Sequence, residues 1–346
     1  MKIWLPYIRG GSGVDVFTNL LAHGLRAQGV EAVTQALPHA LQYAPHLLRA
    51  LRPPQGTEVI VTNSWNGFAF PRAGVKLVVI EHHCIFDPIY TPYRSKAQGI
   101  FHDLLVRRFE QASFDHADLV IAVSRYTAQA TAKVFSNVNP LVILNGVDTD
   151  FFSPGDKRGK APDQVFRMLF VGNLTERKGA DLLAPIMREL GPGFKLHYTG
   201  GLRTKRATPP APNMFATGHL SNEALRQAYR DADALLFPTR LEGFGYAAAE
   251  AMSCGTPVIA SDVSAIPEVV DHGVTGLLCP VNDVPAFIQA AKRLKQDPAQ
   301  LAAMGTNARE AATDRFNLDV MARIYTDVFS NLRQQLADKS TPRQSL

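Results

Sequence analysis

The chain has 346 residues, of which 46% are hydrophobic and 19% are charged, and its formal net charge is +5. A chain of this length exceeds the usual size of a domain with a single hydrophobic core, so we expect two domains. The composition excludes a largely disordered chain. The charge is too small and too evenly spread for a nucleic-acid binder. The three cysteines, Cys84, Cys254 and Cys279, lack metal-ligand spacing, which fits a reducing cytosol.

Membrane-spanning and secretory segments are not expected. No apolar run approaches the length of about 18 residues that a spanning helix needs, and the N-terminal stretch MKIWLPYIRGGSG does not have the pattern of a signal peptide. We therefore expect a cytoplasmic protein, either soluble or peripheral on the cytosolic face of the membrane.

Short apolar runs alternate with longer amphipathic segments, which is typical of βα units on a parallel sheet. In the first half we expect helices from about Val14 to Gln28 and from about Lys96 to Ala117. The strands expected there are KIWLPYI, EAVTQ, EVIVT, VKLVVIE, DLVIAVS and PLVIL. The segment PGDKRGKAPDQ is rich in proline, glycine and charge and therefore predicts a linker.

The same pattern restarts after the linker. The strands expected in the second half are FRMLFVG, FKLHYTG, ADALLFP, TPVIAS and TGLLCP, with NEALRQAYRD as a helix and an amphipathic helix at about 317–337. The sequence thus predicts an α/β protein of two doubly wound, Rossmann-like domains, at 1–155 and 156–346. Ligands of such folds bind at the carboxyl ends of the strands, so we expect function on the βα loops, facing a cleft.

Two loops of the first domain carry candidate residues. The stretch RGGSG places Gly11 and Gly13 between a strand and a helix, where glycine permits close approach and the helix N-terminus offers N–H groups to an anion; a tight turn is the alternative. His82 and His83 follow a strand and should point to opposite faces, so one of them is expected to be functional. The alternative is a buried histidine whose hydrogen bonds are all made within the protein core. Asp87 is expected to cap the turn before a proline.

The loop VGNLTERKG follows the first strand of the second domain. It contains Gly172 and delivers Arg177 and Lys178 just before a helix that starts near Gly179. Two cations beside a helix N-terminus can hold a diphosphate without a metal. A solvated charge pair is the alternative.

The stretch RLEGFGYAAAE places Glu242 and Glu250 on either side of Gly243 and Gly245, at the start of a helix of small residues. Glycine amides and a helix N-terminus suit an anion, which the carboxylates would repel unless they bind neutral hydroxyls beside it. A nucleotide sugar has this layout, with sugar hydroxyls, a diphosphate and ribose hydroxyls in succession. As a loop carboxylate, Glu242 is expected to contribute little to packing.

These motifs resemble those of a known family. The E-x7-E spacing in EGFGYAAAE, followed by AMSCGTPVIAS and EVVDHGVTGLL, is similar to that of the retaining glycosyltransferases of family 4, which have the GT-B fold. The stretches AVSRYTAQ, NGVDTDFFSP, VGNLTERKG and ADALLFPTRLEGFG are also similar, in the same order. The resemblance spans nearly the whole chain.

The resemblance implies the transfer of a hexose from a UDP- or GDP-sugar to a glycan or a polyprenyl- or lipid-linked acceptor, in cell-surface polysaccharide synthesis. It implies no metal and no further cofactor, no nucleic acid, and a last helix that crosses back to the first domain. The residues implied in catalysis are His82, Arg177, Lys178 and Glu242. Those implied in donor binding are Gly11, Gly13, His83, Gly172, Gly243, Phe244, Gly245, Tyr246 and Glu250.

Two other functions fit the same residues. A GT-B-fold epimerase or hydrolase would turn over the nucleotide sugar without an acceptor, and a non-catalytic protein would only bind it. A further hypothesis concerns the segment FDPIYTPYRSKAQGIFHDLLVRRFE, whose aromatic, proline and basic residues predict peripheral membrane contact. The alternative is that Arg107 and Arg108 form the solvated face of a core helix.

Overall fold

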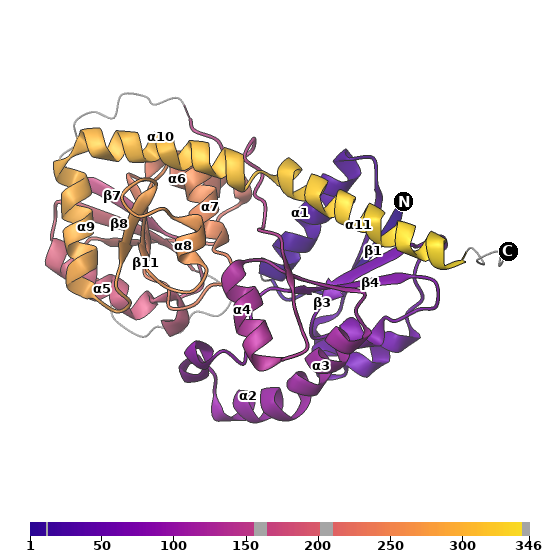
Figure 1. Ribbon diagram of the computed structural model, residues 1–346. Coiled ribbons are helices and arrows are strands. Elements are labelled where there is room, and N and C mark those ends of the chain that lie inside the picture. Colours follow the sequence, from indigo (N-terminus) through magenta and orange to yellow (C-terminus); the bar gives the residue numbers. More distant parts are fainter. Residues whose placement is uncertain (12, 156–164, 201–209, 341–346) are drawn as a thin grey trace. The chain divides into compact units, whose positions relative to one another are not determined.

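The computed structural model describes residues 1–11, 13–155, 165–200 and 210–340. The chain divides into two compact units, which Figure 1 colours along the sequence. The first comprises Met1–Gly146 and the helix that begins at Leu318, and the second comprises Val147–Asn317. Most of the expected linker, PGDKRGKAPDQ, lies outside the described residues.

The first unit is built on a parallel sheet of six strands in the order β2-β1-β3-β4-β5-β6. The strands are β1 (Lys2–Ile8), β2 (Glu31–Leu37), β3 (Val59–Asn63), β4 (Lys76–Glu81), β5 (Leu119–Ala122) and β6 (Leu141–Val142). All six coincide with strands that the sequence predicts. Every residue of β4 is buried, as expected for a parallel sheet that is covered on both faces.

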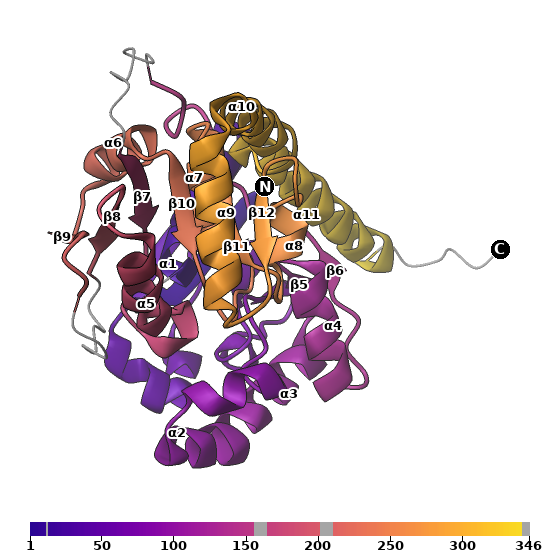
Figure 2. The same cartoon turned by 90° about the vertical axis from the view of Figure 1, so that its left-hand side faces the viewer.

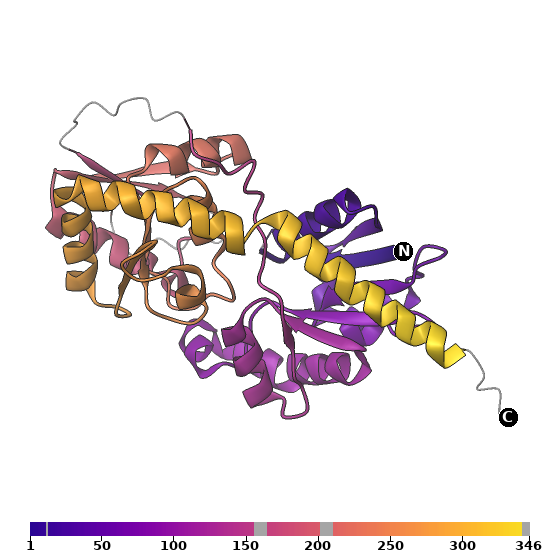
Figure 3. The same cartoon turned by 45° about the horizontal axis from the view of Figure 1, so that its top comes forward.

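Helices cover this sheet. They are α1 (Gly13–Ala27), α2 (Lys96–Phe101), α3 (Arg107–His116), α4 (Arg125–Val134) and α11 (Leu318–Ser340). Short helical turns are η1 (His39–Tyr43), η2 (Pro45–Ala50), η3 (Gly67–Ala69) and η4 (Pro88–Tyr93). Helix α11 lies against α1 (Figures 1 and 3), and Gly24 permits this contact, because a Cβ there would lie 2.6 Å from the Cβ of Ala322.

The helix expected from Lys96 to Ala117 is interrupted. A π-helical turn, η5 (His102–Val106), separates α2 from α3. A π turn holds one more residue than an α turn, and both ends of this one, His102 and Val106, are buried. The amphipathic pattern predicts the helical stretch correctly and misses the extra residue.

The second unit has a parallel sheet in the order β12-β11-β10-β7-β8-β9. Its strands are β7 (Phe166–Phe170), β8 (Phe194–Thr199), β9 (Met214–Gly218), β10 (Ala234–Phe237), β11 (Val258–Ser261) and β12 (Gly276–Cys279). The sequence does not predict β9, because this edge strand is mostly exposed and lacks an apolar run. Five of the six strands were therefore expected.

The helices of this unit are α5 (Ala180–Leu190), α6 (Asn222–Asp231), α7 (Tyr246–Ser253), α8 (Ile266–Val269), α9 (Val284–Gln296) and α10 (Pro298–Arg315), with a short turn, η6 (Glu176–Lys178). Helices α5 and α9 pack side by side (Figure 2). Their apolar residues, including Ile186 and Phe287, form one core with Phe170 and Leu236 of the sheet.

The order of strands reverses once in each sheet. In the first unit the chain runs from β1 to β2 and then returns to place β3 on the other side of β1; in the second, β10 lies on the other side of β7. Ligands of doubly wound sheets bind outside the carboxyl ends of the strands at such a switch point. The loops after β1, β3, β7 and β10 are therefore the places to look for a site.

Candidate functional site

The loop after β7 contains a tight turn that only glycine can make. Gly179 lies between η6 and α5 with a φ of 70°, and a Cβ there would lie 1.9 Å from the carbonyl oxygen of Pro238. The turn therefore presses directly on the loop that follows β10. This contact brings Arg177 and Lys178 to the loop that carries Glu242.

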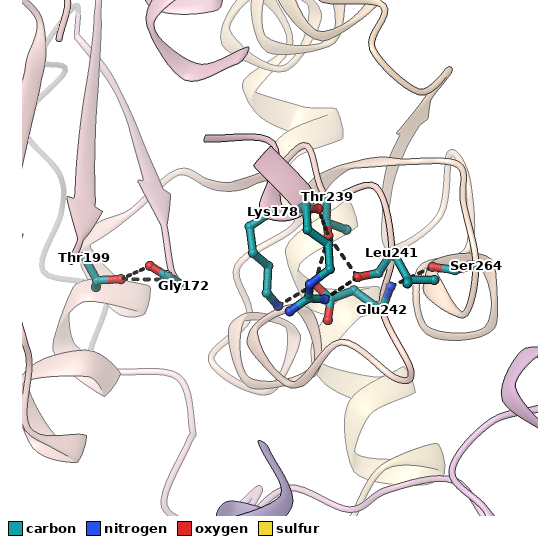
Figure 4. A network of polar contacts seen from close by, with 8 residues as sticks. Gly172, Lys178, Thr199, Thr239, Leu241, Glu242 and Ser264 are labelled. Carbon is teal, nitrogen blue, oxygen red and sulfur yellow. Dashed lines mark hydrogen bonds and ion pairs between the residues drawn. The ribbon is translucent and has the colours of Figure 1, made fainter. Parts of the chain in front are cut away.

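Glu242 is paired and buried. Lys178 Nζ lies 2.5 Å from Glu242 Oε1, and Thr239 Oγ1 donates to the same oxygen at 2.9 Å (Figure 4). The residue is 7% exposed. The expectation that this loop carboxylate contributes little to packing is therefore wrong: the side chain is enclosed between two loops, which the local sequence does not reveal.

The charges explain why a carboxylate is stable there. Burial raises the pKa of Glu242, but Lys178 and Arg177 more than offset this and hold the pKa of Glu242 below its usual value. Burial also lowers the pKa of Lys178, while Glu242 counteracts that effect. Glu242 is thus an anion that depends on its cationic neighbours.

Backbone groups and a second ion pair fix the geometry of both loops. Arg177 Nη1 donates to the carbonyl oxygen of Leu241 at 2.7 Å, and the backbone N–H of Glu242 donates to Ser264 Oγ at 2.9 Å (Figure 4). Behind them the buried Arg240 binds both carboxylate oxygens of Asp181 at 2.6 Å.

Three of these supporting side chains were missed from the sequence. Arg240 and Ser264 were not singled out because their partners, Asp181 and Glu242, are distant in sequence. Thr239 was missed although its partner Glu242 lies only three residues away, in the stretch PTRLEG.

The entry to α7 requires glycine and is tightly packed. Gly245 has a φ of 106°, and a Cβ there would lie 2.9 Å from Ile266 Cδ1. Phe244 is 3% exposed, and its ring packs edge-on against that of Phe316 at 5.5 Å. Its side chain therefore belongs to the core, and only its backbone can face a ligand. Tyr246 is the first residue of α7, and its ring packs edge-on against Phe244 at 5.4 Å.

Glu250 lies in α7 and bonds a buried tyrosine. Tyr229 donates its hydroxyl hydrogen to Glu250 Oε2 at 2.8 Å. Burial raises the pKa of Glu250 to about 7, although the bond from Tyr229 opposes this rise. The carboxyl group thus changes its ionisation near neutral pH.

Gly172 lies just after β7, beside the end of β8. Its backbone N–H donates to Thr199 Oγ1 at 3.0 Å (Figure 4), and its φ of 150° belongs to a region that other residues rarely adopt. The structure therefore explains why glycine is present, independently of any ligand.

In the first unit, the glycine loop after β1 already binds a carboxylate. The N–H groups of Gly10 and Gly11 donate to Asp15 of α1, at 3.1 Å and 2.8 Å. These two N–H groups precede α1 and are engaged by Asp15, an acidic residue in the first turn of that helix, so they do not offer themselves to an anion in this conformation. Anion binding by the N-terminus of α1 itself stays a prediction. Gly13 is the first residue of α1.

The two histidines after β4 have different surroundings. The ring of His82 packs edge-on against Phe17 of α1 at 4.8 Å, whereas that of His83 packs against Tyr90 at 6.0 Å. Burial, together with the charge of His83, lowers the pKa of His82 to about 3, so this ring is neutral at physiological pH. Asp87 caps η4, as predicted, by accepting from the N–H of Ile89.

Two buried carboxyl groups lie near the end of β4 and were also missed. Glu81 and Glu110 are both buried, and Ser64 Oγ donates to Glu110 Oε1 at 3.0 Å. Burial raises the pKa of Glu81 to about 8. No spacing in the sequence indicates this pair, because Glu110 comes from α3.

The described residues contain neither a metal-binding cluster nor a membrane-spanning helix. In the part of the chain that the structure describes, no cluster of three His, Cys, Asp or Glu residues could hold a metal ion. No helix within the described ranges combines the length and the apolar character that crossing a membrane requires.

Comparison with known proteins gives matches along most of the chain. Residues 32–151 match the model of Glycosyltransferase Family 4, and residues 165–297 match that of Glycosyl transferases group 1. The lipopolysaccharide core biosynthesis mannosyltransferase LpsB of Rhizobium meliloti is 31% identical over 239 residues, which cover 62% of this chain and 66% of that protein. The chain spans about half to two thirds of the length of the curated relatives it matches.

Solved structures show the same fold. Sucrose-phosphate synthase from Thermosynechococcus elongatus aligns over 96% of this chain and 99% of its own, with a TM-score of 0.80 and 22% identity. Anabaena HepE in complex with UDP-glucose aligns over 96% of this chain and 100% of its own, with a TM-score of 0.74 and 16% identity. The two Rossmann-like units, each with a parallel six-stranded sheet, therefore have the predicted GT-B fold.

Proposed function

Because the chain belongs to glycosyltransferase family 4, which its two matched segments and its GT-B fold establish, we propose that it is a retaining hexosyltransferase. Its donor is a nucleotide diphosphate sugar, and its acceptor is a glycan or a polyprenyl- or lipid-linked sugar. The name of LpsB, a mannosyltransferase of lipopolysaccharide core biosynthesis, supports a hexose and a role in cell-surface polysaccharide synthesis. The complex of HepE with UDP-glucose supports the donor class.

One observation carries this proposal. At the switch point of the second sheet, the loops after β7 and β10 bring Arg177, Lys178 and Glu242 together beside the glycine-rich start of α7. Two cations and a helix N-terminus provide positive charge for a diphosphate. Arg177 uses one N–H on a carbonyl oxygen, and a guanidinium has five in all.

The proposed mechanism follows from these positions. Arg177 and Lys178 neutralise the leaving diphosphate, so that no metal ion is required. Glu242 accepts hydrogen bonds from the donor sugar's hydroxyls, with the backbone of Gly243, Phe244 and Gly245 beside it.

The remaining residues bind the rest of the donor. Glu250 accepts from the ribose, and His82 contacts the sugar near the reacting carbon. The residues Gly11, Gly13, His83, Gly172 and Tyr246 complete the proposed donor site. The enzyme then acts mainly by positioning the substrates and by stabilising the charge that develops on the leaving group.

The proposal is tested by binding and turnover. Thermal shift against UDP-, GDP-, ADP- and dTDP-sugars identifies the donor, and transfer is then measured with and without chelator. Glu242→Gln keeps the size of the side chain and an acceptor oxygen for Lys178 but removes the charge, so we expect a loss of about 10²–10³ in rate per folded protein, together with a loss of stability. Glu310→Gln, at an exposed position in α10, is the control and should transfer at the wild-type rate.

Three results would contradict parts of the proposal. Near wild-type transfer by Glu242→Gln would remove the assigned role of Glu242. Loss of activity in chelator, restored by Mn²⁺ or Mg²⁺, would refute metal independence. Consumption of the donor at full rate without any acceptor would favour the epimerase or hydrolase.

A further inference from the structure

A small polar cavity lies beneath His82 in the first unit. Its volume is about 10 Å³, and its lining includes Phe17 and Thr18 of α1, Thr62 and Asn63 of β3, and His82. A cavity of roughly this size holds one water molecule when two or more polar groups line it. The polar side chains on its wall meet that condition.

Asn63 lines this space and has an unsatisfied acceptor. Its Oδ1 is buried and has no hydrogen-bond partner among the described residues. In the register of the sheet Asn63 is paired with Ile80 of β4, and His82 follows two residues later. Because residues two apart on a strand share a face, Asn63 and His82 lie on the same side of the sheet, under α1.

Thr18 of α1 supplies a second acceptor. Its hydroxyl donates to the carbonyl oxygen of Val14 at 2.9 Å, so the oxygen retains lone pairs for another donor. A water molecule in the cavity therefore has two oxygen atoms to which it can donate.

His82 completes the set as a donor. Because burial holds its pKa near 3, the ring is neutral and carries one N–H and one acceptor nitrogen. Which nitrogen carries the proton is decided by the hydrogen bonds that the ring makes. Phe17 covers the ring edge-on and offers it no such bond.

We propose that Asn63 is a positioning residue that holds His82 through one internal water molecule. The water accepts the ring N–H that points into the cavity and donates to Asn63 Oδ1 and Thr18 Oγ1. This arrangement fixes one tautomer of His82 and leaves the other ring nitrogen as an acceptor. The water molecule and the tautomer of His82 do not depend on the proposed function. The expected effect of Asn63 on the rate of hexose transfer does rest on it.

A high-resolution crystal structure of the wild-type protein is the first test. We expect density for one water molecule at about 2.7–3.2 Å from both Asn63 Oδ1 and a ring nitrogen of His82. A dry cavity, or a direct bond between the two side chains, would overturn the proposal.

The tautomer is the second test. In protein labelled with ¹⁵N-histidine, long-range ¹H–¹⁵N spectra should show a single neutral tautomer for His82, whose signal is assigned by its loss in His82→Gln. Asn63→Leu removes the acceptor and should give a mixture of tautomers, while Asn63→Asp retains an acceptor oxygen and should preserve the single one. Thr62→Val is the control, because neighbouring residues on a strand point to opposite faces, so the side chain of Thr62 lies on the other side of β3 from Asn63, where its hydroxyl donates to the carbonyl oxygen of Pro6 at 3.2 Å.

The outcomes are separable. An unchanged tautomer in folded Asn63→Leu would refute the positioning role, and if that variant does not fold, the wild-type density still decides. If the protein transfers a hexose, Asn63→Leu should lower kcat about tenfold, the effect of a modest displacement of a catalytic group, with a smaller change in the donor KM. Absence of transfer by the wild type would refute the proposed function and leave the crystallographic and spectroscopic tests in force.

Discussion

At the scale of single residues, Glu242 shows that the surroundings of a side chain in the fold determine its exposure and its ionisation. Its position between a strand and a glycine-rich turn identifies it as a candidate, but the local sequence suggests an exposed carboxylate. In the structure Lys178 and Thr239 both bond one of its oxygens. Alanine would leave the largely buried Lys178 with neither an opposite charge nor an acceptor, which is usually strongly destabilising. Glutamine also removes the charge but keeps an amide oxygen to which Lys178 and Thr239 can donate, so it is the milder replacement.

Glu250 gives a prediction about pH. Its pKa is raised to about 7 by burial, so the carboxyl group is mostly protonated at pH 6 and mostly ionised at pH 8. Ribose hydroxyls that donate to Glu250 favour the ionised form, and donor binding should therefore tighten as the pH rises, by about tenfold over that interval. Calorimetric titration with the intact nucleotide sugar at pH 6, 7 and 8 measures this.

The matched variant for this prediction is Glu250→Gln, which cannot ionise. Its donor affinity should vary little with pH. An equal slope in the variant and the wild type would assign the pH dependence to another group. Because His82 has a pKa near 3, it should add nothing to the slope in this range.

At the scale of elements, the turn between η6 and α5 links the two loops of the site. We predict that replacing the glycine of this turn, in the variant Gly179→Ala, lowers both stability and transfer. The left-handed backbone alone should cost about 1–2 kcal/mol, and the new Cβ would overlap the carbonyl oxygen of Pro238, which lies 1.9 Å from its ideal position. We expect a loss of unfolding free energy above that of strain alone, together with loss of transfer, because the clash displaces Arg177 and Lys178.

Gly29 provides the control for this experiment. Its φ is 75°, and the N–H groups of Gly29 and Val30 donate to the carbonyl oxygens of Arg26 and Leu25, as at a left-handed helix C-terminus, yet a Cβ there would meet no atom within 4 Å. Gly29→Ala should therefore show the strain of the left-handed backbone alone and retain transfer. Urea denaturation of both variants separates the two effects, and equal losses of unfolding free energy would show that the contact with Pro238 is unimportant.

The elements also show where prediction from sequence succeeds. Buried strands such as β4 and β10 consist entirely of buried residues, and such apolar runs are visible in the sequence. The edge strand β9 has no such run, so nothing marked it. The helical stretch from Lys96 was predicted by its amphipathic pattern, but the π turn at His102 depends on tertiary packing, which a periodic pattern does not encode.

At the scale of the whole chain, the types of residue in the candidate site could be predicted, but their partners could not. Arg177, Lys178 and Glu242 were all identified from their loops. The ion pair joins residues that are 64 positions apart, and it forms because β7 and β10 are neighbours at the switch point of the sheet. Strand order is a property of the folded chain, so neither the pairing nor the support from Ser264 followed from local sequence.

The proposed membrane contact also takes a different form in the structure. Two of the cations first considered for it are engaged: Arg94 pairs with Asp103 at 3.1 Å, and the guanidinium of Arg107 lies 4.5 Å from the centre of the Phe86 ring. Large apolar residues are exposed in the same segment, among them Ile100 and two leucines. We define the α2 patch as Ile100, Leu104 and Leu105, which are 61%, 57% and 41% exposed.

The last prediction is that the protein binds anionic membranes through the α2 patch. The exposed cations Lys96 and Arg108 flank the patch in sequence, and basic residues near an anionic leaflet contribute about 1 kcal/mol each. In flotation experiments at low salt, the wild type should rise with anionic vesicles and much less with neutral ones, and Leu104→Glu should remain at the bottom. Val274→Glu, at an exposed apolar position in the second unit, should float like the wild type. If wild type and Leu104→Glu float equally, another surface is responsible; if the wild type binds neither kind of vesicle and transfers efficiently to a soluble acceptor, the acceptor is not membrane-bound.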